Sequence, residues 1–528
     1  MLSRRNALRL AAGAAAALHA PAVRAQSARV LKFIPHSNLI SLDPIWTPAA
    51  VVRNHGFMVF DTLYGLDEHY RPQPQMAAGH VFEEDERICT ITLREGLTFH
   101  DGEKVRATDA VASLRRWMRR ASVGQKLAEV TDELVALDDR RLQFRLKRRF
   151  PQLIRSLGQV AVPIPFIMPE RLAQTDPFRQ FREVVGSGPF RFRQSEFNPG
   201  SLAVYERFEG YQPVASGSPS LIAGPKRVWF DRVEWHIIPD PATAAAALQS
   251  GAMDWYEAPP TELEALLQRS RGISVEALEP LPRPALMRIN HLNRPLSDLR
   301  IRQALLPALD QSDFMAAVVG AEPSRIFSDF GVYTPGTPYA SRAGLEPLLG
   351  PRDVDKAKRM LREAGYAGEP VRLLAAMDVP AQAALAQMGA DLFRRVGMNL
   401  DFVAVDWGTL MQRTTSREPL EKGGWSAYCT FFPGLEFTDP GAHLVLRGNG
   451  LAGANGWPTS PRLEALREEW FQAPDEGAEK RIATEMQRVA MEEVLFIPLG
   501  AYRANTAIKR SLRGRVQGLP VFWGLHQA

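Results

Sequence analysis

Residues 93–114 read LREGLTFHDGEKVRATDAVASL and carry a complete strand, turn and helix signal. The strand signal begins upstream, because residues 88–94 alternate apolar and polar side chains as a half-buried strand does. Asp101-Gly102 is a turn signal. Thr108 is a candidate N-cap for a helix from Asp109 to about Arg120. The stretch therefore predicts a strand joined to an amphipathic helix by a tight turn.

Helix and strand signals alternate along the rest of the chain. Helices are predicted over 242–250, 261–269, 298–318, 353–364, 380–396, 462–472 and 476–492, and strands over 29–34, 140–147, 228–238, 285–290, 371–376, 399–404 and 494–499. Asp353 is a candidate N-cap for its helix, and Gly365 ends that helix. The alternation indicates an α/β or α+β fold. The 528 residues exceed the roughly 250–300 that one core serves, so two or more domains are expected.

Residues 1–25 have the pattern of a cleavable export signal. Arg4-Arg5 precedes a short apolar stretch, and Val23-Arg24-Ala25 supplies small residues at the two positions that signal peptidase reads. The segment Ser3–Leu8 is similar to a twin-arginine motif with alanine at its usual phenylalanine position, and an ordinary Sec signal is the alternative. The apolar stretch is far shorter than the roughly 20 residues that cross a bilayer. We expect cleavage after Ala25 and a soluble periplasmic product.

The formal net charge of +5 falls to +1 once this signal is removed. Cleavage takes away four arginines and no acids, which leaves 60 basic and 59 acidic residues. A field that attracts nucleic acid is therefore not expected. The two cysteines, Cys89 and Cys429, exclude a disulfide-rich scaffold and a multi-cysteine metal site. A disulfide between them is permitted in an exported protein, and two unpaired buried thiols are an equal alternative.

The sequence lacks the common motifs of catalysis and cofactor binding. It contains no H-E-x-x-H, no G-x-S-x-G and no P-loop, and no two histidines are spaced as a helical metal pair. One G-x-G-x-x-G occurs at 448–453, but the ANGWP that follows at 454–458 cannot start the helix that a dinucleotide site needs. We interpret it as a glycine-rich loop. No catalytic residue, cofactor or metal is predicted.

Aromatic residues gather late in the chain. Residues 423–432 read GGWSAYCTFF, Trp407 precedes them, and Phe522-Trp523 lies near the C-terminus. One interpretation is a core strand. The other is the wall of a cleft, because binding pockets combine aromatic faces with a few polar groups.

The stretch at 93–114 resembles the signature of the extracellular solute-binding proteins of family 5, which include the dipeptide- and oligopeptide-binding components of bacterial ABC importers. The family pattern, close to L-R-x-G-x-x-F-H-D-G-x-x-x-x-A-x-D-x-x-x-S, is matched at Leu93, Arg94, Gly96, Phe99, His100, Asp101, Gly102, Ala107, Asp109 and Ser113. Further landmarks follow in family order: Leu42-Asp43-Pro44, Phe60–Tyr64, Gly186–Phe190, Gly251 with Asp254, Arg300–Leu305, Asp353–Tyr366 and Ile497-Pro498-Leu499. The resemblance spans essentially the whole chain after the signal.

This resemblance implies an α/β, two-lobe periplasmic-binding-protein (Venus-flytrap) fold with an inserted third subdomain and a discontinuous first lobe. Carried onto this chain, lobe I comprises 26–45, 185–280 and 497–528, the inserted subdomain comprises 46–184, and lobe II comprises 281–496. The chain would cross between the lobes at 280–284 and at the strand over 494–499. His100 would belong to the inserted subdomain and be structural.

The resemblance also implies a ligand between the lobes, where extended peptides bind by strand-like main-chain hydrogen bonds. Gly424–Ala427 matches the family's cleft segment in lobe II. Peptide binders place an Asp directly after it to pair with the ligand's α-ammonium, whereas this chain has Tyr428. Glu436 and Asp439 follow, either as replacements for that charge or as solvated loop acids. The predicted ligand-binding residues are Trp407, Trp425, Ser426, Ala427, Tyr428, Glu436 and Asp439.

The functional hypothesis is a non-enzymatic, monomeric periplasmic receptor that captures a peptide or peptide-like solute and delivers it to an inner-membrane ABC permease. One alternative keeps the fold and changes the ligand to a nickel chelate, haem, an oligosaccharide or an opine-like solute. The scattered histidines disfavour a metal. An exported hydrolase is less favoured, because no motif marks a nucleophile, a base and an orienting group. No cofactor, nucleic-acid partner or membrane span is expected.

Overall fold

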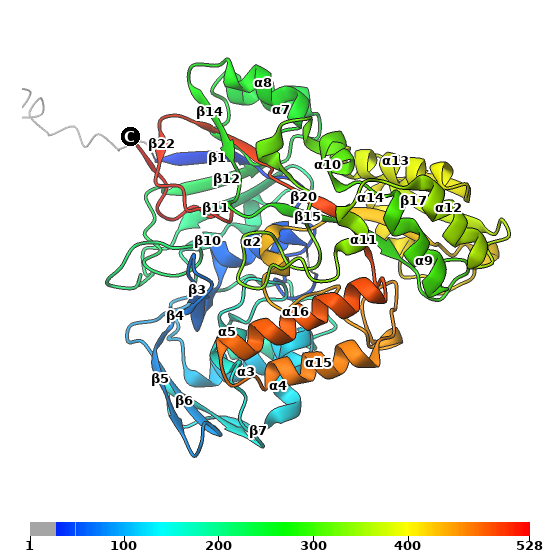
Figure 1. The fold of residues 1–528 in the computed structure, drawn as a ribbon. Helices are drawn as coiled ribbons and strands as arrows, with labels where there is room; N and C mark the ends of the chain where they lie inside the picture. The colour runs from blue at the N-terminus through cyan, green and yellow to red at the C-terminus, as the bar shows by residue number, and fades with distance from the viewer. Residues whose placement is uncertain (1–27, 48) are drawn as a thin grey trace, which may run out of the picture.

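The computed structural model describes residues 28–47 and 49–528, so the predicted export signal lies outside the described residues. Two large mixed sheets and one smaller sheet organise the molecule (Figure 1). The first large sheet has the order β10-β11-β12-β1-β13-β21-β14, with β10 (Phe190–Phe192), β11 (Leu202–Arg207), β12 (Arg232–His236), β1 (Val30–Ile34), β13 (Trp255–Tyr256), β21 (Asn505–Lys509) and β14 (Ile273–Ala277). Its centre, β1, is parallel to both neighbours.

The first sheet is covered differently on its two faces. Helices α7 (Pro241–Gln249) and α8 (Thr261–Gln268) pack on one face, around Ile34 and Tyr256. Alternation along β1 turns Phe33 to the other face, where its ring lies 5.0 Å from that of Trp255 and 5.1 Å from that of Phe522. The predicted aromatic pair at 522–523 is therefore core of this sheet.

The second large sheet has the order β16-β20-β15-β19-β17-β18, with β16 (Ile326–Phe327), β20 (Ile497–Tyr502), β15 (Arg283–Ile289), β19 (Ala427–Phe431), β17 (Pro370–Ala376) and β18 (Asn399–Val405). Four helices belong to the core on one of its faces: α9 (Leu299–Leu305), α10 (Gln311–Val319), α12 (Val354–Glu363) and α13 (Pro380–Arg395). Strand β17 is parallel to both β18 and β19.

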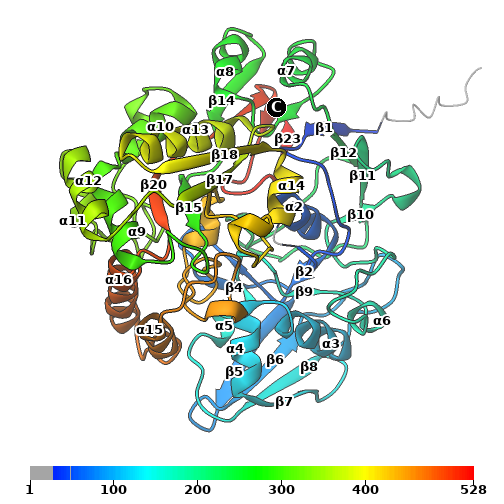
Figure 2. The ribbon, with the colours of Figure 1, turned by 90° about the vertical axis from the view of Figure 1, so that its right-hand side faces the viewer.

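The inserted part is built on a four-stranded antiparallel sheet, which Figure 2 shows at the bottom of the molecule. Its strands are β5 (Ala77–Glu83), β6 (Ile88–Leu93), β8 (Arg141–Leu146) and β7 (Thr131–Ala136), and its main helices are α3 (Ala107–Met118), α4 (Ser122–Val130) and α5 (Leu153–Leu157). Shorter elements join it to the first sheet: α2 (Ala50–Val59), β2 (Asp61–Thr62), β3 (Tyr64–Leu66), β4 (Pro72–Pro74), β9 (Phe166–Ile167) and α6 (Glu170–Ala173). The family signature thus forms β6, a turn and α3.

Two short segments connect the large sheets. One runs from β14 to β15 over residues 278–282, and the other from β20 to β21 over 503–504. The expected division began the last part of lobe I at 497, but β20 pairs with β15 and β16, so the chain leaves the second sheet only after Tyr502. The molecule has the two-lobe α/β fold, with one lobe around each large sheet.

Helices α15 (Pro461–Phe471) and α16 (Glu476–Glu492) extend from lobe II to the inserted part, as Figures 1 and 2 both show. The rings of Phe150 and Phe471 stack with centroids 5.5 Å apart. Arg155 Nη1 donates to Glu479 Oε2 at 2.8 Å. The inserted part therefore contacts lobe II through both apolar and charged side chains.

Most predicted elements occur near their expected positions, and the differences have local causes. The helix expected over 298–318 is split into α9 and α10, because Pro307 lacks an N–H and a 3-10 turn (Leu306–Ala308) replaces the helix there. Helix α3 starts at Ala107, before the expected cap Thr108, and the Asp109 carboxylate accepts the N–H of Arg106 at 2.8 Å. Asp353 caps α12 as predicted, accepting the N–H of Lys356.

The remaining elements are short or peripheral: α11 (Glu346–Leu349), α14 (Trp407–Arg413), β22 (Leu512–Arg513) and β23 (His526–Gln527). The G-x-G-x-x-G segment forms a 3-10 turn (Gly450–Ala452) within a loop, which confirms that interpretation. Cys89 and Cys429 are both unpaired and buried. Within 28–47 and 49–528, no helix is long and apolar enough to span a membrane, and no three His, Cys, Asp or Glu side chains are grouped as a metal site.

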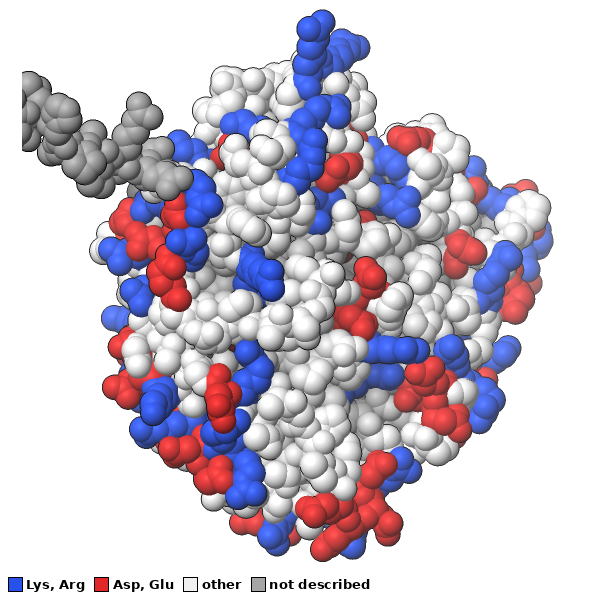
Figure 3. Space-filling model, turned by 90° about the vertical axis from the view of Figure 1, so that its left-hand side faces the viewer, with Lys and Arg blue, Asp and Glu red and all other residues white. Residues whose placement is uncertain are grey.

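Charged side chains of both signs share the face drawn in Figure 3. Basic side chains gather toward its top, acidic side chains toward its lower edge, and a broad uncharged area lies between them. This face carries no continuous field of one sign.

Candidate functional site

The parallel strands of lobe I end at an edge that carries a fixed carboxylate. In sheets of this type ligands bind beyond the carboxyl ends of parallel strands. His36 follows β1, and Glu257 follows β13. The N–H of His36 donates to Glu257 Oε2 at 2.7 Å, and His36 Nδ1 lies 2.8 Å from both carboxylate oxygens. Burial alone would raise the pKa of Glu257, but the charge and hydrogen bonds of His36 hold that pKa below its ordinary value.

The corresponding edge of lobe II presents partly exposed apolar side chains. Asp406 follows β18 and caps α14 by accepting the N–H of Thr409 at 2.9 Å. Trp407 begins α14, and its N–H donates to Asp378 Oδ1 at 2.8 Å. Nearby in the chain, Met377 is 40% and Met411 37% exposed. Trp407 is half-buried and lies at this edge.

The two edges are linked through the first crossing between the lobes. Arg283 lies at the start of β15 and contributes to the low pKa of Glu257. Its guanidinium is 5.7 Å from the ring centroid of Phe431, the last residue of β19. Figure 2 shows α14 and the segment that follows β1 on the same side of the molecule. The carboxyl ends of both sheets therefore flank the same inter-lobe region.

Trp425 and Tyr428 belong to a small aromatic cluster in lobe II. Their ring centroids are 5.4 Å apart, and Trp457 lies 6.1 Å from Trp425. Leu374, Ala376 and Leu410 complete the cluster, and Trp407 packs against it. Trp425 is fully buried, and its indole N–H has no hydrogen-bond partner among the described residues. The cluster is part of the hydrophobic core of lobe II, and the Trp425 indole N–H inside it makes no hydrogen bond with a described residue.

Ser426 and Ala427 lie between Trp425 and Tyr428 in the chain and stabilise the backbone of the sheet. The Ser426 hydroxyl accepts the N–H of Arg372 at 3.0 Å, and Asn290 donates from its N–H to the carbonyl of Ser426 at 2.9 Å. Ala427 is fully buried beneath the lobe II helices. These two side chains are buried and hold β19 against its neighbours.

Glu436 is already paired within the protein. Arg53 Nη1 of α2 donates to Glu436 Oε1 at 2.8 Å, and the N–H of Val162 donates to Oε2 at 3.3 Å. Both side chains of the pair are buried. Burial raises the pKa of Glu436 to about 7, against the opposing influence of Arg53. The pair joins the inserted part to lobe II.

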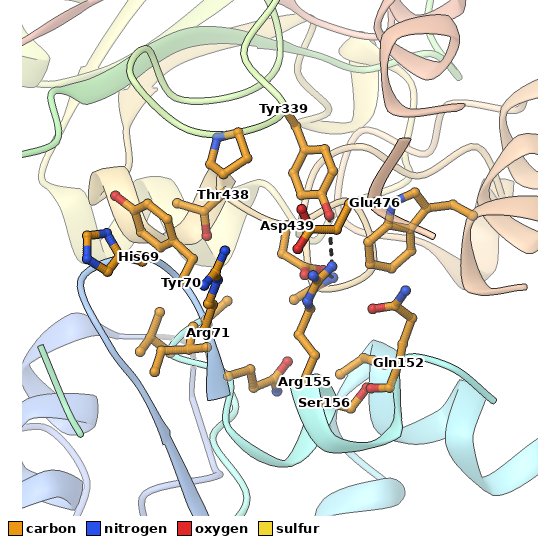
Figure 4. A pocket seen from close by; sticks show the side chains of 18 of the residues that line it. His69, Tyr70, Arg71, Gln152, Arg155, Ser156, Tyr339, Thr438, Asp439 and Glu476 are labelled. Carbon is orange, nitrogen blue, oxygen red and sulfur yellow. Dashed lines mark hydrogen bonds between the residues drawn. The ribbon is translucent and has the colours of Figure 1, made fainter. Parts of the chain in front are cut away.

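Asp439 lines a cavity of about 230 Å³ between the inserted part and lobe II, drawn in Figure 4. Arg155 rises into this cavity from α5, and its Nη1 donates to the Tyr339 hydroxyl at 2.8 Å. Asp439 Oδ1 accepts the N–H groups of Gly441 and Ala442. Burial raises the pKa of Asp439, although Arg155 and the two N–H donors oppose the shift. The positive charge of Arg155, from the inserted part, therefore acts on the Asp439 carboxylate.

A larger cavity of about 1280 Å³ lies beside the two crossings. It is lined by segments of both lobes and of the first crossing: 217–221, 279–282, 335–338 and 514–518. His69, Tyr70, Pro338 and Lys480 line both cavities, so the two adjoin. Its volume suits a peptide-sized solute. None of the seven predicted ligand-binding residues is among its lining residues.

The structure adds arginines that sequence reasoning missed. Arg53 and Arg155 lie in the inserted part, hundreds of residues from their acidic partners, and no local pattern connects them. Arg288 lies opposite Tyr428 in the second sheet. Its one sequence signal is a charged residue inside the apolar run at 285–289.

Comparisons with known proteins give a consistent result over the whole chain. Residues 71–434 match the family described as bacterial extracellular solute-binding proteins, family 5. A protein of Sinorhizobium fredii named as a probable peptide ABC transporter periplasmic-binding protein is 34% identical, with 100% of each chain covered. A dipeptide-binding protein from Pseudoalteromonas in complex with Met-Leu superposes with a TM-score of 0.78 at 18% identity, covering 95% of this chain and 100% of that chain. The agropinic acid complex of a binding protein from A. tumefaciens gives a TM-score of 0.77 at 20% identity, with 94% and 99% covered.

Proposed function

Because the chain belongs to the bacterial extracellular solute-binding proteins of family 5, we propose that it is the periplasmic binding component of an ABC importer for a peptide or peptide-like solute. The full-length match to a relative named for peptide transport carries this proposal. The protein hands its solute to an inner-membrane permease and acts as a monomer. It makes and breaks no bond, and its affinity comes from closing the lobes over the solute and excluding water.

The solute lies between the lobes, against the carboxyl ends of the parallel strands. Lobe I contributes the edge with His36 and Glu257, and lobe II contributes the edge with Trp407, Tyr428 and the aromatic cluster around Trp425. Aromatic faces suit an apolar side chain or ring of the solute. We keep the expected division into lobes as part of this proposal and move the second crossing to residues 503–504, because β20 pairs within the lobe II sheet. In this arrangement Glu436 and Asp439 face protein cations, so neither is a free partner for an ammonium group.

A solute without a free α-ammonium is the second candidate. Tyr428 stands where peptide binders of the family carry the pairing Asp, and it offers a ring and a hydroxyl but no charge. A blocked peptide or an opine-like solute fits this position as well as a free peptide does.

Lobe closure gives the direct test of this function. Protein purified without refolding should retain its cellular solute, which native mass spectrometry identifies by mass. Adding that solute to stripped protein should lower the radius of gyration in small-angle scattering, because contacts made only in the closed state shift the equilibrium toward it. Identical scattering of stripped and saturated protein would count against a hinged receptor.

Export is a separate expectation from residues 1–25. The mature protein should begin at Gln26 and be found in the periplasm, and N-terminal sequencing of protein from the native host measures this directly. Replacing Arg4 and Arg5 together with Lys should block export only on the twin-arginine route. Retention of Met1 in the periplasmic protein would contradict the cleavage.

A further inference from the structure

Arg288 and Tyr428 lie side by side on one face of the lobe II sheet. They are direct partners in the antiparallel pairing of β15 with β19, and Tyr428 is also the partner of Leu374 in β17. Directly paired residues point to the same face of a sheet. The opposite face, with Met287 and Cys429, approaches Gly389 of α13. Arg288 and Tyr428 therefore point away from that helix layer, on the side of the sheet that holds the aromatic cluster.

Arg288 differs from the other buried cations of the described chain. It is 5% exposed and makes no salt bridge with any described residue. Its Nη2 donates to the carbonyl of Asn455, and the Tyr428 side chain interacts with the guanidinium. Four other buried cations have a carboxylate partner: Arg53 with Glu436, Arg116 with Asp43, Lys226 with Asp61, and Arg325 with Glu264. Arg302 donates to four backbone carbonyls. Arg467 resembles Arg288 in donating to a carbonyl, that of Gly441, without a salt bridge to any described residue, but Glu464 and Asp439 lie close enough for their charges to act on it.

The titratable side chains that interact with Arg288 are Tyr428, His291 and His443. Burial lowers the pKa of both His291 and His443 to about 3, so these neighbours stay neutral at physiological pH. Tyr428 interacts with the guanidinium, and within the described part of the chain no aspartate or glutamate forms a salt bridge with it. Burial lowers the pKa of Arg288, but a guanidinium remains charged in proteins. A buried charge without a counter-charge is costly, so this position calls for an anion from outside the chain.

A loop covers Arg288 and would have to move aside before a ligand could reach the guanidinium. This loop is the glycine-rich segment 448–457, which touches Arg288 through Asn455 and places Trp457 in the aromatic cluster. Toward β15, the His291 N–H donates to the Gly456 carbonyl at 2.8 Å, and Gly456 packs closely on the Ile289 carbonyl. On its other side, Asn455 Nδ2 donates to the Thr414 hydroxyl at 3.2 Å. A ligand oxyanion would take the place of the Asn455 carbonyl.

We infer that Arg288 is the anchor for an anionic group of the solute, with the Tyr428 hydroxyl as a second donor. The ligand class is then a carboxylate, or a comparable oxyanion, attached to an apolar or ring-bearing group that packs against the cluster of Trp425. Arginine suits this task because its planar fork donates two parallel hydrogen bonds to a carboxylate. This inference rests on the proposed receptor function. In this inference Arg288 and Tyr428 bind the negatively charged end of the solute.

Matched probes test the charge preference by calorimetry. The carboxylates are N-acetyl-phenylalanyl-alanine, phenylalanyl-alanine and 3-phenylpropionate. Each control is the same molecule with its carboxylate replaced by a neutral amide, which leaves the ammonium of phenylalanyl-alanine in place. The wild-type protein should bind at least one carboxylate more than tenfold tighter than its amide. Equal binding of each acid and its amide, or binding of no acid at all, would overturn the assignment.

Variants of Arg288 separate an anchor from a structural residue. Arg288→Met should remove the preference for the acid, and Arg288→Lys should retain part of it. Without ligand, Arg288→Met should melt at or above the wild-type temperature, because no carboxylate loses its partner. Arg53→Met is the matched control, since it leaves Glu436 alone and should melt lower. A lower melting temperature of Arg288→Met with an intact acid preference would make Arg288 structural.

The solute retained from the cell distinguishes this inference from the receptor function. If that solute closes the lobes but carries no anionic group, the protein remains a receptor and the role of Arg288 is refuted. If no solute closes the lobes, the receptor function itself fails.

Discussion

Trp425→Ala should lower the free energy of unfolding by about 3–5 kcal/mol and weaken solute binding more than tenfold. The indole is fully buried among Tyr428, Trp457 and aliphatic side chains, so its removal leaves a cavity that the sheet cannot close. The same cavity loosens the wall against which we place the solute. Urea unfolding measures the first effect, and calorimetry with the solute retained from the cell measures the second.

Two variants control this result. Trp425→Phe keeps an aromatic face and should retain most of the stability, which allows binding to be measured on folded protein. Trp229→Ala removes a 47% exposed side chain that lines the large cavity beside the crossings. Its stability should stay within about 0.5 kcal/mol of wild type. Loss of binding in Trp229→Ala, with binding intact in Trp425→Ala, would move the solute to that cavity.

Arg53→Met should cost about 3–5 kcal/mol at pH 8 and clearly less at pH 5. The variant leaves the Glu436 carboxylate buried with only the Val162 N–H at hydrogen-bond distance. At pH 5 the carboxyl group can take up a proton, which removes the uncompensated charge. Urea unfolding at several pH values between 5 and 8 measures the difference.

The direction of this pH dependence follows from the pKa of Glu436. In the folded wild type that pKa is about 7, above the ordinary 4.5. Between these values the folded state binds more protons than the unfolded state, so the contribution of Glu436 to stability is present at low pH and declines as pH rises. Losing Arg53 removes an influence that lowers the pKa, and the decline should then extend to higher pH.

A second substitution isolates the carboxylate. Adding Glu436→Gln to Arg53→Met should restore part of the stability at pH 8 and flatten the pH dependence, since an amide carries no charge. An equal loss for Arg53→Met at pH 5 and pH 8 would show that the cost comes from lost packing of the arginine stem rather than from the charge.

Local signals in the sequence predicted most of the elements near their observed positions. The alternation over 88–94 and the turn at Asp101-Gly102 predict β6 and the bend before α3, because strand period and turn chemistry act over a few residues. The helix over 353–364 has its cap and its stop within the same stretch. The split of the helix over 298–318 at Pro307 was also available locally, from the missing N–H of proline.

The charge pairs of the candidate site were not predictable in this way. Glu436 and Asp439 appear in the sequence as free loop acids, yet Arg53 binds the first and Arg155 acts on the second. Arg53 is 383 residues from Glu436 in the chain, and only the packing of the inserted part against lobe II brings them together. The spacing of residues within a short stretch of sequence cannot predict a contact between residues so far apart in the chain.

The sequence by itself therefore determined the alternation of helices and strands and the aromatic stretch at 423–432, because each depends on residues close together in the chain. The ordered landmarks along the chain identified the family, and that resemblance implied the two-lobe fold. Only the tertiary structure decided that Trp425 is fully buried, that Glu436 is already paired and that Arg288, beside Tyr428, makes no salt bridge within residues 28–47 and 49–528. Those states depend on which strands and subdomains meet. A partner's charge acts through distance in space, and separation along the chain does not encode that distance.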